Sequence, residues 1–178
     1  MYSLLGISGS LRVDAMNRKL IREAARLFAQ NRYVEADINF PLFDADVEAQ
    51  TGIPAAVERL IDDITKADAV VISTPEYNKG PSGALKNALD WVSRASNNPW
   101  RGKPVAVMSA SAGRAGGERA QSVLRGFMVP FRPRIMQGPE IHLANAAKEF
   151  NEEGHLTSMI YLETLQELMD ELLFEVLL

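Results

Sequence analysis

The sequence predicts an open α/β fold in which a five-stranded parallel sheet lies between two layers of helices. Two observations predict this fold. Short apolar runs of strand length alternate along the chain with longer segments whose apolar residues recur at helical spacing. Glycine, serine and proline gather between several of these runs and the helices that follow them. Because strands that alternate with helices pair in parallel and bury both faces, helices are expected on both sides of the sheet.

The first half of the chain supplies two expected strands and two expected helices. The apolar run 2–8 predicts a buried strand, and the alternating segment 33–40 predicts a second one. The segment 17–30 between them carries apolar residues three and four apart, which predicts a helix. Residues 40–54 hold two prolines, a glycine and several acids, which indicates a loop. An amphipathic helix is expected over 55–67.

The second half continues the same alternation. Its expected elements are a strand over 68–75, a helix over 82–96, a strand over 103–111, a helix over 116–128, a strand over 134–143 and a helix over 157–177. Gly138 and Pro139 interrupt the last of these strands. The leucines and methionines of the final helix are expected to pack against the sheet or a second subunit. No repeat or linker is found, so residues 1–178 are expected to form one domain.

Composition excludes several classes of function. Of the 178 residues, 47% are hydrophobic and 24% charged, as in a soluble globular chain that can bury a core. The net charge is −4 and the cations are scattered, which argues against nucleic-acid binding. No cysteine is present, which excludes disulfides, thiol catalysis and cysteine-bound metals, and no metal site is expected. Without a signal-like start or a run of ~20 apolar residues, we expect a cytoplasmic protein that does not bind membranes.

Three loops are the expected place for a ligand. In a doubly wound sheet, ligands bind beyond the carboxyl ends of the strands, near the point where the strand order reverses. The loops at these ends are 8–17, 75–83 and 109–117. They are also the segments of the chain with the most unusual composition, and this coincidence predicts a binding site.

The first loop predicts an anion site. It leads into a helix N-terminus, where free N–H groups and the positive end of the helix dipole attract a phosphate. Ser8, Ser10 and Asn17 add neutral donors, Arg12 adds a planar cation, and Gly9 permits close approach of the backbone. The loop is neither a Walker A motif nor GxGxxG. For each residue alone a simple helix-capping turn remains the alternative, but the set together favours phosphate.

The second and third loops have the composition expected around a planar ring. Backbone N–H groups of 76–78 could bond such a ring, and Tyr77 could stack on it, although a plain surface turn is the alternative. Glycines in the segment 109–117 permit close approach to a ligand. Arg114 could meet a second anion, or it could simply be a solvated side chain.

Three segments together resemble the NADPH-dependent FMN reductase family, a flavodoxin-like group that includes quinone, chromate and azo-dye reductases. They are "GSLRVDAMN" (9–17), "PEYNKGPSGALKNALDWVSR" (75–94) and "SASAGRAGGERA" (109–120), and the second is the most specific. Their order and spacing cover the chain from Gly6 to about Gly138. The resemblance implies a flavodoxin-like three-layer fold, bound FMN, NADPH or NADH as electron donor, and a homodimer or homotetramer with the flavin near a subunit boundary.

The resemblance also implies roles for particular residues. The phosphate would be held by Ser10, Arg12 and Asn17 with Ser8 nearby, the isoalloxazine ring would be lined by Pro75, Glu76, Tyr77 and Asn78, and its other edge would meet Ser109, Ser111 and Gly113. The sequence departs from the family at Ala15, where a serine usually contacts the phosphate. One neutral hydrogen bond, worth about 1 kcal/mol, is therefore in doubt.

The expected function is an FMN-dependent NAD(P)H oxidoreductase that passes hydride through flavin N5 to a quinone, flavin, azo or metal-oxyanion acceptor. No side chain is expected to act as acid or base, because the flavin carries the chemistry. His142 and His155 lie outside the three loops and are expected to be structural and on the surface, respectively. One alternative is an FMN electron carrier or redox sensor with little NAD(P)H activity. Another is a flavin-free domain for a phosphorylated metabolite, against which the match at 75–94 argues.

Overall fold

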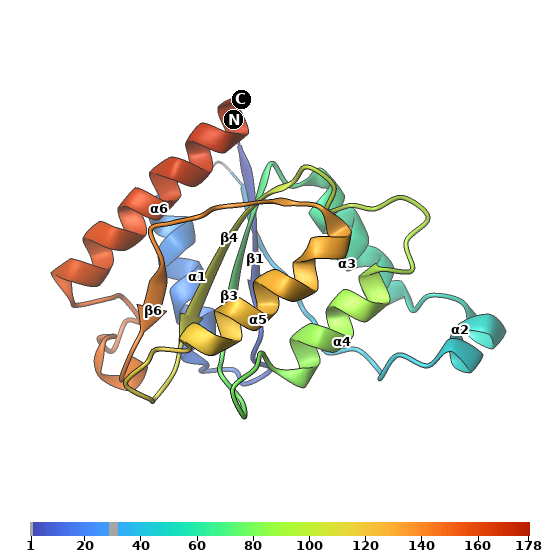
Figure 1. The fold of residues 1–178 in the computed structure, drawn as a ribbon, viewed down its shortest axis with the longest axis horizontal. Helices are drawn as coiled ribbons and strands as arrows, with labels where there is room; N and C mark the ends of the chain where they lie inside the picture. Colours follow the sequence, from blue (N-terminus) through green and yellow to red (C-terminus); the bar gives the residue numbers. More distant parts are fainter. Residues whose placement is uncertain (1, 29–31) are drawn as a thin grey trace.

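A parallel sheet forms the centre of the protein (Figure 1). The computed structural model describes residues 2–28 and 32–178, and over this part of the chain six strands join one sheet. Its order is β2-β1-β3-β4-β5, and β6 also pairs with β4. The strands are β1 (Ser3–Ser8), β2 (Arg32–Glu35), β3 (Ala69–Thr74), β4 (Pro104–Ala110), β5 (Arg134–Ile135) and β6 (Ile141–Leu143). Every pair is parallel, which confirms the predicted fold class.

Helices cover both faces of this sheet, as predicted. The α-helices are α1 (Met16–Leu27), α2 (Ala45–Thr51), α3 (Ala55–Lys66), α4 (Gly83–Val92), α5 (Glu118–Met128) and α6 (Met159–Leu177). Two short 3₁₀ helices, η1 (Val129–Phe131) and η2 (Ala146–Lys148), complete the described elements. One apolar core joins the sheet to α1 and α6, and a second joins its other face to α3, α4 and α5. The central strands β1, β3 and β4 consist mostly of apolar residues because both of their faces are buried.

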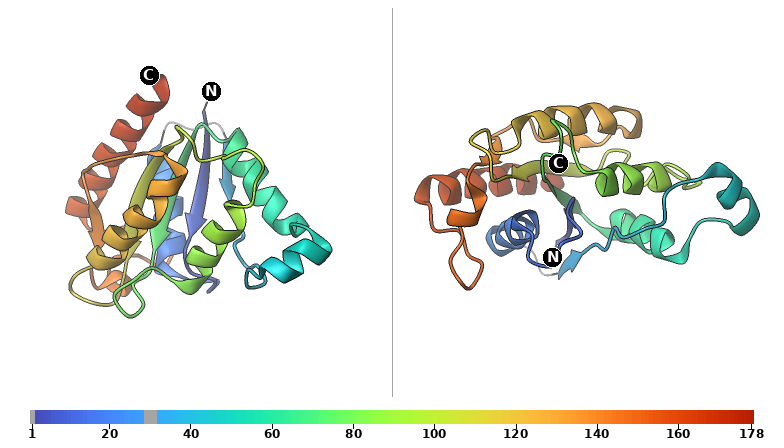
Figure 2. Two further views of the ribbon diagram at one scale, coloured as in Figure 1. Left: turned by 45° about the vertical axis from the view of Figure 1, so that its right-hand side comes forward. Right: turned by 90° about the horizontal axis from the view of Figure 1, so that it is seen from below.

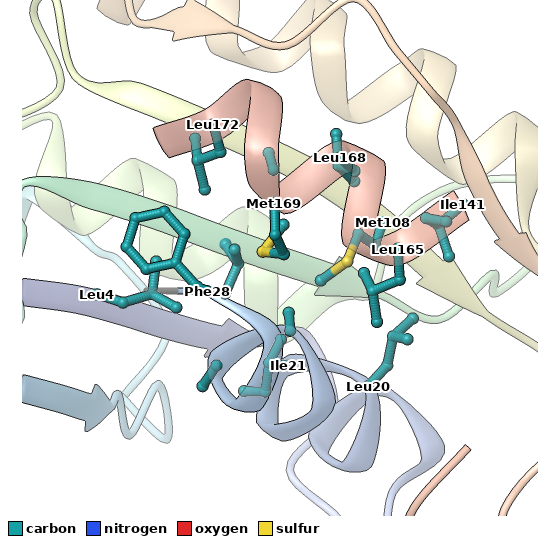
Figure 3. Packing of buried hydrophobic residues seen from close by; sticks show 14 of the residues in the cluster. Leu4, Leu20, Ile21, Phe28, Met108, Ile141, Leu165, Leu168, Met169 and Leu172 are labelled. Carbon is teal, nitrogen blue, oxygen red and sulfur yellow. The ribbon is translucent and has the colours of Figure 1, made fainter. Parts of the chain in front are cut away.

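The core between the sheet, α1 and α6 explains the pattern of the last helix. Figure 3 shows Ile21 from α1 and Leu165 and Met169 from α6 gathered around Met108 of β4. These four side chains are at most 1% exposed. The leucine and methionine stripe of α6 therefore packs against the sheet, which is one of the two environments expected for it.

Several element boundaries differ from the prediction. β2 ends at Glu35 rather than at residue 40, and the expected loop 40–54 contains α2. α4 ends at Val92, and the expected strand 134–143 is divided into β5 and β6. Residues 29 and 30, expected at the end of the first helix, lie outside the described residues.

The segment after β2 leaves the sheet because α4 offers it polar partners. The N–H of Ala36 donates to Gly6 O (2.9 Å), and the chain then crosses to α4. There Trp91 Nε1 donates to Pro41 O (2.7 Å), and Asn87 Oδ1 accepts from the N–H of Phe43 (2.8 Å). α2 follows as an arm that projects from the body of the molecule (Figures 1 and 2). No helix within residues 2–28 and 32–178 is long and apolar enough to cross a bilayer.

Candidate functional site

The three loops singled out in the sequence meet at one edge of the sheet. β1, β3 and β4 end at the same level, since Ser8 pairs with Ser73, and Thr74 pairs with Ser109. A cavity of about 360 Å³ lies beyond these ends, and we call it the carboxyl-edge cavity. Its lining residues are Ser10, Arg12, Ala15, Met16, Asn17, Pro75, Glu76, Tyr77, Ala110, Ser111, Ala112, Ala146 and Ala147.

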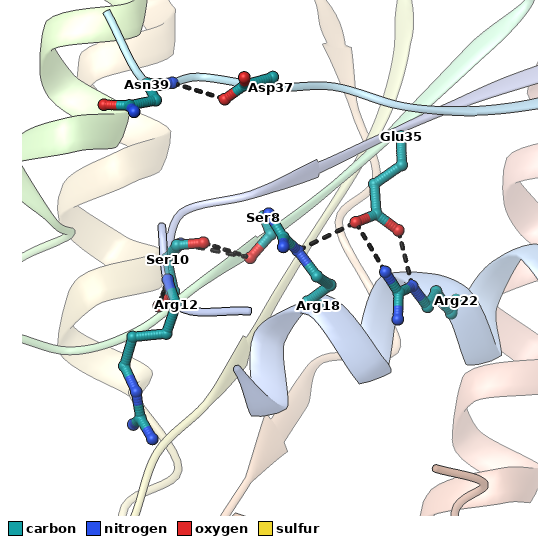
Figure 4. A network of polar contacts seen from close by, with 8 residues as sticks. All are labelled: Ser8, Ser10, Arg12, Arg18, Arg22, Glu35, Asp37 and Asn39. Atoms are coloured by element: carbon teal, nitrogen blue, oxygen red, sulfur yellow. Dashed lines mark hydrogen bonds and ion pairs between the residues drawn. The ribbon is translucent and has the colours of Figure 1, made fainter. Parts of the chain in front are cut away.

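Hydroxyl groups within the first loop fold its backbone. Ser8 Oγ accepts from the N–H of Ser10 (3.2 Å) and donates to the Ser10 carbonyl (3.3 Å), as Figure 4 shows. Ser10 Oγ accepts from the N–H of Arg12 (3.4 Å). Gly9 packs against Pro75, and a Cβ atom at this position would lie 3.0 Å from the Pro75 ring. The first and second loops are therefore in direct contact, and a side chain at Gly9 would require the two loops to move apart by a few tenths of an ångström.

Arg12 differs from the other arginines near this loop. Arg18 and Arg22 both pair with Glu35, at 2.9 Å and 2.7 Å. Arg12 is exposed, lines the cavity and points away from that cluster in Figure 4. Within the described residues its guanidinium takes part in no ion pair. Arg12 is therefore the cation of this region that is available to a ligand anion.

The N-terminus of α1 opens toward the carboxyl-edge cavity. Its N-cap is Ala15, which has extended dihedral angles (φ −68°, ψ 136°) and no side chain that can bond the helix amides. The Ala15 carbonyl accepts from Arg18 (2.9 Å) and Lys19 (3.1 Å). The amides of Met16 and Asn17 have no carbonyl one turn before them and need an acceptor from elsewhere. Such an end attracts an anion.

The second loop is a tight turn that presents an aromatic ring. The backbones of Tyr77 and Gly80 exchange two hydrogen bonds (2.9 and 3.1 Å), with Asn78 and Lys79 in the left-handed region between them. The Tyr77 side chain is 52% exposed and lines the cavity. Because the Tyr77 N–H is used within the turn, it is not free to bond a ring, contrary to the expectation for 76–78. The carboxylate of Glu76 accepts from the N–H of Ala120, at the start of α5 (3.3 Å).

The third loop is held to the segment that follows β6. The N–H of Ser111 donates to Leu143 O, and the N–H of Ala146 donates to Ser111 O, both at 3.0 Å. These bonds place η2 against the cavity, where Ala146 and Ala147 form part of its wall. The sequence carries no signal for this contribution, because two alanines in an irregular segment form no recognisable motif.

Ser109 lies beneath the third loop rather than at the cavity. It is fully buried, donates to Gly116 O (2.6 Å) and accepts from Gln121 Nε2 (2.9 Å). Gln121 Nε2 also donates to Ile141 O (2.6 Å), so this network joins β4, α5 and β6. In this structure the hydroxyl of Ser109 is therefore used to support the loop.

The residues named from the resemblance divide into two groups. Ser10, Arg12, Asn17, Pro75, Glu76, Tyr77 and Ser111 line the cavity. Ser8, Asn78, Ser109 and Gly113 are not among its lining residues and lie in the backbone turns or the buried layer beneath. Ala15 lines the cavity and is 3% exposed, so the departure from the family pattern does face the site.

A charged cluster outside the cavity joins α1 to the segment that follows η2. Glu23 of α1 is only 2% exposed and is paired with Arg26 (2.9 Å) and with His155 Nδ1 (2.6 Å). His155 belongs to a hairpin in which Phe150 and Leu156 form a bridge, directly after η2. His155 is on the surface, as predicted, but its contact with Glu23 was not expected.

The balance of contacts at Glu23 lowers its pKa. Burial alone raises the pKa of the carboxyl group, but hydrogen bonds from Arg26 and His155 and the charge of Arg26 bring it below its usual value of 4.5. The carboxylate is therefore the stable form at neutral pH, and it ties the hairpin to α1.

Comparison with known proteins agrees with this architecture. The family model for NADPH-dependent FMN reductases matches residues 2–168. An NAD(P)H-dependent FMN reductase of Pseudomonas aeruginosa is 42% identical over 171 residues, which cover 95% of this chain and 92% of the relative. A quinone reductase of Escherichia coli K12 is 42% identical over 135 residues, covering 74% and 72%. Among solved structures, the NAD(P)H:(acceptor) oxidoreductase FerB of Paracoccus denitrificans superposes with a TM-score of 0.87 at 32% identity, covering 99% and 97%.

The fold and the site define a flavodoxin-like flavoenzyme. The chain belongs to the NADPH-dependent FMN reductase family, as its three loops indicate. Membership confirms the predicted class, an oxidoreductase that uses FMN and NAD(P)H. The cavity also fits FMN chemically, because the uncapped end of α1 and the guanidinium of Arg12, which has no ion-pair partner in the described part of the chain, suit its phosphate.

Proposed function

We propose that the protein transfers hydride from NAD(P)H to a quinone-type acceptor, with FMN seated in the carboxyl-edge cavity. When bound, FMN supplies the redox chemistry, because its N5 atom can take hydride from a nicotinamide and pass two electrons to an acceptor. The quinone reductase among the relatives supports a quinone as acceptor. The side chains of the cavity bind and orient these planar groups.

The cavity offers distinct places for the two ends of the cofactor. Ser10, Arg12 and the amides at the start of α1 are proposed to hold the phosphate, since they supply hydroxyl, cationic and N–H donors. Pro75, Glu76, Tyr77 and Ser111 are proposed to line the isoalloxazine ring, because they come from the loops after β3 and β4. No acid or base is required of them.

The main support for this proposal is that Arg12 and Tyr77 line the same cavity. Arg12 lies on the loop after β1 and Tyr77 on the loop after β3, and both line the same space. A group with a phosphate at one end and a flat ring at the other satisfies both side chains at once.

The test is the visible spectrum of the purified protein before and after addition of NADPH or NADH without oxygen. We expect the protein to be yellow as purified or to become yellow when FMN is added. NADPH or NADH should bleach this colour, and benzoquinone should restore it. A yellow protein that neither nicotinamide bleaches would instead support an electron carrier or redox sensor. A colourless protein that does not bind added FMN would contradict both the reductase and the electron-carrier function.

We also propose that the protein forms a homodimer or homotetramer. A groove of about 520 Å³ lies between α4 and α5, and we call it the α4–α5 groove. Apolar side chains from both helices and from η1 contribute to it, and Val129, which precedes the lining residue Pro130 in η1, is 71% exposed. Apolar surface of this kind is stabilised by a protein neighbour. The groove is lined by Lys86, Leu89, Asp90, Val92, Ser93, Ala95, Asn98, Phe127, Pro130 and Phe131. Sedimentation that shows a single copy at micromolar concentration would contradict this proposal.

We further propose that the protein acts in the cytoplasm. The absence of cysteine from the sequence supports a compartment in which disulfides contribute nothing to stability. Fractionation of the source cells, with the protein detected by an antibody, tests this location; recovery in the extracellular fraction would contradict it.

A further inference from the structure

The carboxamide of Asn17 is almost fully used inside the protein. Its Oδ1 accepts from Ser73 Oγ (2.7 Å) and from the N–H of Ala110 (3.0 Å), and its Nδ2 donates to the Ala110 carbonyl (2.9 Å). Asn17 is 4% exposed, and Ser73 is fully buried. An amide oxygen has two lone pairs and an amide nitrogen has two hydrogens, so one N–H alone remains for any further partner.

These three bonds join three elements of the site. Asn17 lies in the first turn of α1, next to the uncapped helix end. Ser73 lies near the end of β3, two residues before Pro75. Ala110 is the last residue of β4 and directly precedes Ser111. The loop proposed to hold the phosphate is therefore fixed to both strands whose loops are proposed to line the ring.

We propose that Asn17 is a positioning residue, which sets the distance between the phosphate side and the ring side of the carboxyl-edge cavity. This inference rests on the proposed binding of FMN. It differs from the role that the family resemblance implies, in which Asn17 contacts the phosphate. A phosphate ligand acts on one end of the cofactor, whereas a residue that sets the spacing of the cavity acts on both ends.

The test compares FMN with riboflavin, which has the same ring and no phosphate. Binding of each is measured by quenching of flavin fluorescence, for the wild type and for Asn17→Ala and Asn17→Asp. Alanine removes all three bonds, and aspartate turns the donor to Ala110 O into a second acceptor. Asn17→Ala is expected to weaken FMN and riboflavin by a similar factor, roughly tenfold, because buried partners lose their bonds and the loops separate. Asn17→Asp is expected to weaken both flavins as well, and FMN further, because its carboxylate repels the phosphate.

Arg12→Ala is the matched control, because Arg12 is exposed and takes no part in the Asn17 bonds. It is expected to weaken FMN and leave riboflavin unchanged. Ser73→Ala removes one of the three bonds from a residue that does not line the cavity, and it is expected to cause a smaller loss for both flavins. If the Asn17 variants do not fold, Ser73→Ala carries the same comparison.

The visible spectrum of FMN at saturation provides a second measurement. Asn17→Ala is expected to change the shape of the flavin band, since the loops after β3 and β4 shift against the ring, and Arg12→Ala is expected to leave it unchanged. If Asn17→Ala loses FMN affinity alone, with unchanged riboflavin affinity and spectrum, the positioning role is overturned. A wild type that binds neither flavin would instead overturn the proposed function.

Discussion

The carboxyl-edge cavity and the α4–α5 groove differ in chemistry more than in size. The groove is the larger, at about 520 Å³ against about 360 Å³. The cavity receives an uncapped helix N-terminus and Arg12, which forms no ion pair with the residues that the structure describes. In the groove, by contrast, Lys86 is already paired with Asp90 (2.6 Å) and lies over the Phe127 ring. Unsatisfied donors therefore distinguish the cofactor site, whereas a comparison of volumes would have favoured the groove over the cavity.

The largest expected effect is the loss of cofactor affinity in Arg12→Ala. A charge-assisted contact to a phosphate contributes roughly 1.5–3 kcal/mol, so the FMN dissociation constant should rise roughly 10- to 100-fold. Fluorescence titration measures this change. Glu76→Gln is the control, because glutamine can still accept from the N–H of Ala120 and the phosphate side is untouched. Equal FMN affinity for the wild type and Arg12→Ala would show that the charge of Arg12 does not distinguish the carboxyl-edge cavity from the α4–α5 groove.

A second prediction concerns the hairpin that follows η2, outside the cavity. Glu23→Gln should lower the free energy of unfolding by roughly 1–3 kcal/mol at pH 7, because Arg26 and His155 lose a buried ionised partner. Chemical denaturation measures the loss. His155→Gln, which replaces the 53% exposed partner, should cost less. Equal stability of Glu23→Gln and the wild type would show that the hairpin needs no charge to stay in place.

The lowered pKa of Glu23 also sets the sign of a pH effect. A carboxyl group whose pKa is lower in the folded protein stabilises it above the unfolded value, about 4.5, and loses this contribution as pH falls through the folded value. The stability difference between the wild type and Glu23→Gln should therefore be constant above about pH 5 and shrink below it. A difference that grows on acidification would contradict the assignment.

A third prediction tests the groove. Val129 lies at the edge of the groove, next to its lining residue Pro130, and Val129→Asp should weaken self-association roughly tenfold, because a carboxylate would be carried to the border of an apolar contact. Sedimentation equilibrium measures it, and FMN affinity should remain unchanged. Ile160→Asp is the control, since Ile160 lies on α6 and is similarly exposed, at 75% against 71%. If both variants dissociate the assembly equally, or neither does, the groove is not the interface.

The sequence predicted the sheet and the location of the cavity better than the orientation of individual side chains. Alternation of apolar runs and helices is a property of the whole chain, and the ends of parallel strands meet at one edge whatever their exact bounds. The direction of a hydroxyl is decided by neighbours distant in sequence. Ser109 turns to Gln121 and Gly116 beneath the third loop, and no local pattern carries that information.

α2 and the wall at Ala146 were missed for related reasons. α2 has no buried residue, so it has no apolar face that periodicity could reveal; it is held by the Asp44 cap and by the pairing of Glu48 with Arg94. Ala146 reaches the cavity through backbone bonds to the third loop, which do not depend on its side chain. Contacts made by backbone atoms depend little on residue type, so the sequence does not predict them.

The smallest expected effect is at Ala15, where the cavity differs from the family pattern. Ala15 faces the cavity beside the free amides of α1, so a serine hydroxyl there can donate to a bound phosphate. Ala15→Ser should tighten FMN roughly fivefold, the value of one neutral hydrogen bond of about 1 kcal/mol. Riboflavin affinity should not change, which separates this gain from a general stabilisation of the helix by its new cap. If FMN affinity stays constant while the apoprotein melts at a higher temperature, the hydroxyl has turned to the helix amides. The cavity would then hold its phosphate with Arg12 and Ser10, and the missing serine would be a loss of helix stability rather than of cofactor contact.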